Sequence, residues 1–83
     1  MDRYRVSHES KTRIAVWDDV EDRIAGEAWP QYGRSWPMTI YKYADNEGSD
    51  EKLDQDCQPE RASVIDAIVA AYEEANEIGS SIL

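Results

Sequence analysis

The residues of this chain that are best suited to chemistry are carboxylates, which gather in two acidic runs. The chain holds 18 acidic and 9 basic residues among 83, and its formal net charge is −9 at pH 7. The first run contains Asp18, Asp19, Glu21 and Asp22. The second run contains six more carboxylates, which are Asp45, Glu47, Asp50, Glu51, Asp54 and Asp56. Clustered carboxylates can transfer protons, bind a cation, or present an anionic surface to a cationic partner.

Catalysis is poorly supported by the residue types. Hydrolysis by a carboxylate pair needs a cleft between substantial walls, which a chain of 83 residues does not readily supply. His8 and Cys57 are the single residues of their types, and no motif orients one against the other. The 4 glycines are scattered, so the chain has no glycine-rich phosphate loop. We therefore expect no catalytic residue and no enzyme activity.

Metal binding is not favoured either. One histidine and one cysteine do not make a zinc site. An EF-hand loop that began at Asp45 would need glycine at its sixth position, where the chain has Asp50. We expect no metal and no cofactor.

The distribution of charge favours an anionic binding surface. Residues 18–29 sum to −4 and residues 45–60 to −6, whereas residues 1–17 and 30–44 each sum to +2. The basic residues are too few to neutralise phosphates, so we expect no direct contact with nucleic acid. The acidic runs could instead compete for a lysine- and arginine-rich groove that normally holds DNA or RNA, in an encounter weakened by salt. The alternative is that these runs are solvated faces that aid solubility.

An aromatic-rich loop is predicted between two Trp-Pro pairs, over residues 29–37. The prolines at 30 and 37 favour extended backbone at the tryptophans that precede them. Trp36 is a candidate partner contact, because tryptophan is enriched among the residues that dominate binding energy at interfaces.

Alternation of apolar and polar residues predicts strands at about residues 3–8, 12–17 and 38–43. Residues 18–29 fit either a helix capped by Asp18 or a further strand, and both interpretations stay open. Residues 44–58 are the most polar part of the chain and are predicted to form an acidic loop.

A C-terminal helix is predicted over residues 59–78. Pro59 suits a first helical position and Gly79 suits the stop. Apolar residues form one stripe along the segment, comprising Val64, Ile65, Ile68, Val69, Tyr72 and Ala75. The expected fold is α+β, with a small antiparallel sheet of three to four strands and this amphipathic helix packed on one face.

The length predicts a single small domain over residues 1–83. Its core is modest, so homodimerisation is an open way of supplementing stability. The lone Cys57 fits a reducing cytoplasm. We expect no signal peptide, because the chain begins with the charged, alternating residues Asp2-Arg3-Tyr4-Arg5, and no membrane span, because no apolar run is long enough.

The chain resembles the small acidic proteins that phages and mobile elements use against host defences, namely the anti-CRISPR proteins and DNA-mimic inhibitors. The resemblance extends over the whole chain and rests on its size, its α+β pattern and the acidic runs at Asp18–Asp22 and Asp45–Asp56. It implies a non-enzymatic inhibitor in the host cytosol. Such an inhibitor would occupy the nucleic-acid-binding surface of a host protein or complex, with a CRISPR effector blocked from its target DNA as the leading candidate. The alternative is a small halophilic-type accessory or assembly domain whose acidity serves solubility.

Overall fold

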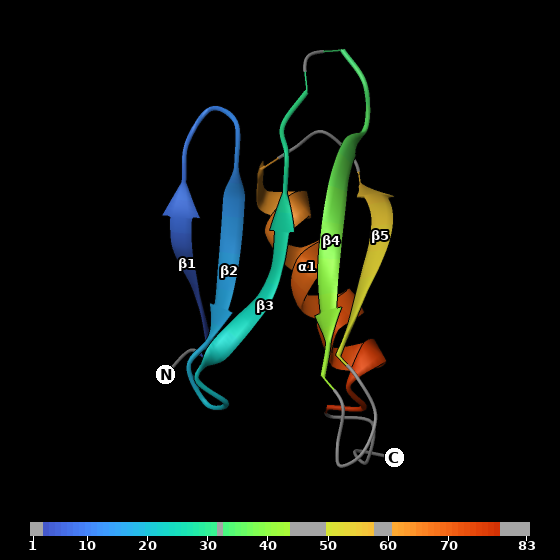
Figure 1. Ribbon diagram of the computed structural model, residues 1–83. Coiled ribbons are helices and arrows are strands. Elements are labelled where there is room, and N and C mark those ends of the chain that lie inside the picture. The colour runs from blue at the N-terminus through green and yellow to red at the C-terminus, as the bar shows by residue number, and fades with distance from the viewer. Residues whose placement is uncertain (1–2, 32, 44–49, 58–60, 79–83) are drawn as a thin grey trace.

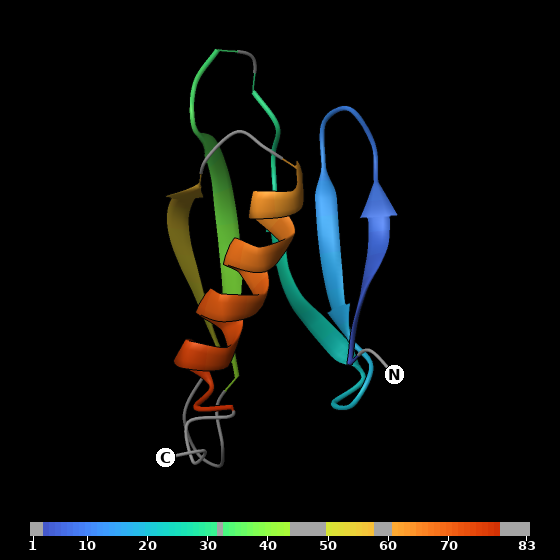
Figure 2. The same ribbon diagram turned by 180° about the vertical axis from the view of Figure 1, so that it is seen from behind.

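The structure is a computed structural model that describes residues 3–31, 33–43, 50–57 and 61–78. It contains five antiparallel strands in the order β1-β2-β3-β4-β5 and one helix, α1, that covers one face of the sheet (Figures 1 and 2). Their bounds are β1 Tyr4–Glu9, β2 Ile14–Asp18, β3 Arg23–Ala28, β4 Trp36–Lys42, β5 Glu51–Cys57 and α1 Arg61–Ala75. The predicted α+β fold is confirmed, with one strand more than the upper number expected.

The structure decides between the two predictions for one segment and corrects two other predicted segments. Residues 23–28 form β3 and residues 19–22 form the turn before it, so the strand interpretation of residues 18–29 holds and the helical one fails. The predicted acidic loop over residues 44–58 is wrong for residues 51–57, which form β5. A strand at the edge of a sheet tolerates charged side chains on both of its faces, so β5 lacks the alternation that marks a half-buried strand. The predicted aromatic loop is also too long, because β4 already begins at Trp36.

The hydrophobic core lies between the sheet and α1. Its fully buried members include Val16 from β2, Ile40 from β4, and Val64, Ile68 and Tyr72 from the helix. These helical residues belong to the predicted apolar stripe, so periodicity located the buried face of the helix correctly.

Gly26 is the point at which the helix crosses the sheet most closely. A Cβ atom at this position would lie 2.7 Å from Ile68 Cγ2 and 2.9 Å from the carbonyl oxygen of Thr39. Any larger residue would force the helix and sheet apart, which explains a glycine in the middle of β3.

The helix ends differently from the prediction. Ala75 is its last residue, and Glu77 takes the left-handed conformation at φ 56° that usually falls to glycine. The Ile78 amide donates to the Glu73 carbonyl and the Glu77 amide to the Glu74 carbonyl, which is the hydrogen-bond pattern of a Schellman motif. The predicted start at Pro59 and stop at Gly79 lie outside the described residues. Along the part of the chain that is described, no helix is long and apolar enough to span a membrane.

Candidate partner-binding surface

Asp18, predicted to contact a partner, is instead a buried structural residue. Its side chain is 0 % exposed. It accepts hydrogen bonds from Arg3 Nε at 2.9 Å, from Arg3 Nη2 at 2.8 Å and from the Tyr72 hydroxyl at 2.6 Å. It also accepts from the backbone amides of Val20 and Glu21, which closes the turn after β2. The prediction for Asp18 is therefore wrong, because a carboxylate enclosed in this way has no surface for a partner.

Electrostatics keep Asp18 ionised despite its burial. Burial by itself would raise the pKa of the carboxyl, but the hydrogen bonds from Arg3, Tyr72 and the two amides outweigh it and lower the pKa to about 2. The same contact raises the pKa of Arg3. Burial, followed by the hydrogen bond to Asp18, raises the pKa of Tyr72, whose hydroxyl also accepts from Arg23 Nε at 3.0 Å. This network joins the N-terminal segment, β2, β3 and α1.

Two further ion pairs neutralise carboxylates on the helix-free face of strands β1 to β3. Arg5 Nε donates to Asp19 Oδ1 at 2.8 Å, and both groups are partly exposed. Arg13 Nε donates to Glu27 Oε1 at 2.6 Å, while the Tyr41 hydroxyl donates to Glu27 Oε2 at 2.5 Å. Burial would raise the pKa of Glu27, but Tyr41 and Arg13 lower it overall. Three of the acidic residues in this half of the molecule are therefore satisfied internally.

The two predicted acidic runs do not meet. Glu21 and Asp22 are exposed in the turn between β2 and β3, whereas β5 is the strand at the far edge of the sheet (Figure 1). Asp45 and Glu47 lie outside the described residues, and Asp50 is exposed immediately before β5. The structure therefore divides the predicted contact residues between two separate places.

The candidate surface is the edge formed by carboxylates on both faces of β5, together with one on the adjacent flank of α1. Glu51, Asp54 and Asp56 are exposed on β5, and Glu74 is exposed on the helix. We call these four residues the β5–α1 acidic surface. Asp54 accepts a hydrogen bond from Thr39 Oγ1 at 2.9 Å, and none of the four forms an ion pair with another described residue.

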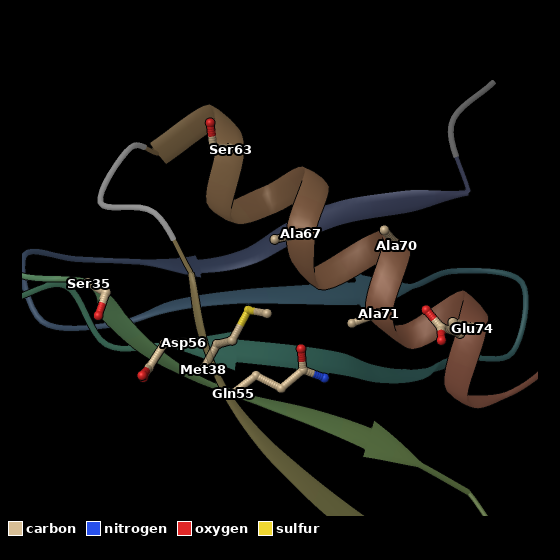
Figure 3. Close-up of a pocket in the computed structure, with 9 residues that line it drawn as sticks. All are labelled: Ser35, Met38, Gln55, Asp56, Ser63, Ala67, Ala70, Ala71 and Glu74. Atoms are coloured by element: carbon tan, nitrogen blue, oxygen red, sulfur yellow. The ribbon is translucent and has the colours of Figure 1, made fainter.

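A groove runs between β5 and α1 beside this surface (Figure 3). Its volume is about 470 Å³. Met38 and Gln55 point into it from the sheet, and the helix faces them with the small side chains Ala67 and Ala71. Asp56 lies toward one end of the groove, with its side chain on the helix-free face of the sheet, and Glu74 lies toward the other end.

Trp36 contributes mainly to the structure. It is half-buried against the hydrophobic core, and its indole Nε1 donates to the carbonyl of Gln31 at 2.9 Å. This placement leaves part of the ring exposed but assigns it no role in the β5–α1 acidic surface. Sequence reasoning missed Glu74, although its spacing from Ala67, Ala70 and Ala71 would place all four on one flank of a helix.

Comparisons with protein-family models, with curated proteins and with solved structures find no match to this chain. Among the described residues, no group of three or more histidine, cysteine, aspartate or glutamate side chains is arranged to hold a metal ion.

Proposed function

We propose that this protein is a non-enzymatic inhibitor that binds the basic nucleic-acid-binding surface of a partner. The contact is the β5–α1 acidic surface, and the leading candidate partner is a CRISPR effector complex that loses access to its target DNA. Such a partner places the inhibitor in the host cytosol, where a lone cysteine stays reduced.

The observation that carries the proposal is the uneven pairing of charge. Residues 3–28 contain six acidic and five basic side chains, whereas residues 50–78 contain nine acidic and two basic ones. The described ion pairs all fall in the first segment. Within the described part of the second segment, the four carboxylates of the β5–α1 acidic surface form no ion pair, and the anionic field that they set up steers association with a cationic partner.

The dimensions of β5 suit a small basic cleft. Glu51 to Asp56 extend over about 17 Å of strand at ~3.3 Å per residue. One strand of B-DNA places about five phosphates along the same length. The three carboxylates of β5 can therefore replace only some of the phosphate contacts, so the complex should depend strongly on salt.

Inhibition of target-DNA binding tests the proposal. Purified CRISPR effector complexes of several types are mixed with labelled target DNA and increasing amounts of the protein, and bound DNA is measured by gel shift. We expect one type to lose its DNA at a stoichiometric amount of protein and to regain it at about 0.5 M salt. The triple variant Glu51→Gln, Asp54→Asn, Asp56→Asn should inhibit at least about tenfold more weakly. Undiminished inhibition by this variant would remove β5 from the contact.

The second candidate function is a halophilic-type assembly domain. It is supported by the solvent-exposed acidic residues in the turn between β2 and β3 and on β5. It predicts that molar KCl raises the melting temperature markedly and that no effector type is inhibited. The inhibitor proposal predicts inhibition whether or not salt stabilises the free protein.

A further inference from the structure

The outer side of β5 is an open sheet edge. β5 pairs with β4 over seven consecutive residues without a bulge, whereas the pairing of β1 with β2 is interrupted by one. β5 is the last strand in the sheet order, and within the described part of the chain no strand pairs with its outer side. Alternate residues of such a strand turn their backbone N–H and C=O groups outward, where another strand can pair with them.

The groove beneath this edge leaves room for side chains of an added strand. The flank of α1 that faces β1 carries Ile65 and Val69, whereas the flank that faces β5 carries Ala67 and Ala71. Small residues on that flank leave the groove of about 470 Å³ open next to Met38 and Gln55 (Figure 3). A sixth strand would extend the sheet beyond β5, and every second side chain, on the helix side, would face the open side of this groove.

The charges on β5 favour one kind of strand as the partner of its open edge. A second copy that paired antiparallel about Asp54 would place Asp54 opposite Asp54, which is unfavourable, although Lys52 would then lie opposite Asp56. A basic partner strand avoids the like-charge pair. The register puts Asp54 and Asp56 on the helix-free face, opposite Thr39 and Pro37 of β4. Side chains on that face of an added strand would lie about 5 Å from these carboxylates, within reach of an ion pair for lysine or arginine.

We propose that β5 binds an extended segment of a partner protein as a sixth strand, in which basic residues alternate with apolar ones. The apolar side chains fill the groove under α1, and the basic side chains contact Asp54 and Asp56. Main-chain hydrogen bonds to β5 supply affinity and the alternating side chains supply specificity. This inference rests on the proposed function, since it specifies which part of the basic partner the β5–α1 acidic surface contacts.

A capped peptide of alternating lysine and valine, about eight residues long, is the probe. It is titrated into the isotope-labelled protein, and amide chemical shifts and amide hydrogen exchange are followed by NMR. We expect saturable shifts centred on Glu51–Cys57 and slowed exchange of the outward-facing amides in that strand. Shifts spread evenly over all acidic regions, including the turn at Glu21 and Asp22, would overturn strand addition.

Two controls separate strand addition from simple charge attraction. The same peptide N-methylated at every residue keeps its charge but has no N–H to donate, and should bind at least about tenfold more weakly. The Ala71→Leu variant, which fills the groove without changing charge, should also weaken binding of the unmodified peptide. Equal affinity for both peptides would overturn the inference. The proposed function would still hold in that case, provided that the triple β5 variant inhibits the effector more weakly than the original protein.

Discussion

The two sides of the sheet use aspartate and glutamate in opposite ways. At the β1–β3 end, Asp18, Asp19 and Glu27 are each held by an arginine, and Asp18 is fully buried. At the β5 end, the four carboxylates of the β5–α1 acidic surface have no such partner among the described residues. The contrast teaches that a high count of acidic residues does not identify a binding surface. Whether an arginine reaches each acid decides whether that acid stabilises the fold or stays exposed to a partner.

Register explains why the pairing is confined to one end. Arg5 lies opposite Trp17 and therefore reaches Asp19, two residues further along the chain. Arg13 precedes Ile14, whose partner on β3 is Ala28, so its guanidinium reaches Glu27. β4 offers no arginine to β5, because Asp54 lies opposite Thr39 and Asp56 opposite Pro37; Lys42 lies opposite Glu51, but the two do not form an ion pair.

The largest effect should come from removing the buried charge. Asp18→Asn leaves Arg3 without its counter-charge and disturbs the bonds to Tyr72 and the turn, so we expect a loss of about 3 kcal/mol in the free energy of unfolding. Chemical denaturation measures this loss. The folded fraction of this variant should inhibit the effector as strongly as the original protein, because Asp18 has no exposed surface. A variant as stable as the original would contradict the assigned structural role.

The same carboxylate predicts the acid sensitivity of the fold. The pKa of Asp18 is lowered from 3.8 in the unfolded chain to about 2 in the fold. Its stabilisation is therefore fully present above pH ~4 and is lost as the pH falls toward 2, by about 2 kcal/mol in total. Between pH 5 and pH 2, the melting temperature should decrease more steeply for the original protein than for Asp18→Asn. Other carboxylates, such as Glu27, contribute an acid dependence of their own to both proteins.

A smaller effect, of opposite sign, is expected at the end of α1. Glu77→Gly removes the cost of a left-handed conformation in a non-glycine residue, so it should stabilise the fold by about 1 kcal/mol. Thermal melting measures the gain. Glu77→Ala serves as the control, since it removes the same carboxylate but keeps a Cβ atom. Equal melting temperatures for the two variants would show that backbone conformation is not the cause.

The smallest effect is expected for the exposed pair on the helix-free face. Arg5→Gln should change the free energy of unfolding by about 0.5 kcal/mol or less, because both partners are partly solvated. It also leaves Asp19 unneutralised, which makes the β1–β3 end more like β5. If inhibition then became markedly stronger, overall negative charge rather than the β5–α1 acidic surface would govern binding.

Local patterns were enough to predict most of the helices and strands, but not which acidic side chains are buried or paired. The apolar stripe through Val64, Ile68 and Tyr72 identified the buried face of α1, and alternation identified β1, β2 and β4. β5 was missed because its exposed edge position allows charge on both faces. The burial of Asp18 was missed because its side-chain partners, Arg3 and Tyr72, lie 15 and 54 residues away along the chain. The glycine at position 26 of β3 could not be explained from the sequence, because its cause, the crossing of Ile68, is a tertiary contact.

The central claim is tested most directly by comparing two variants that each lose three acidic charges. One carries Glu51→Gln, Asp54→Asn and Asp56→Asn on β5; the other carries Asp19→Asn, Glu21→Gln and Asp22→Asn in the turn after β2. The measurement is the concentration of each that displaces target DNA from the inhibited effector. We predict that the β5 variant requires at least about tenfold more protein than the turn variant, which should behave almost like the original. Equal loss in both variants would contradict the account, because binding would then follow total charge rather than the unpaired carboxylates of one sheet edge.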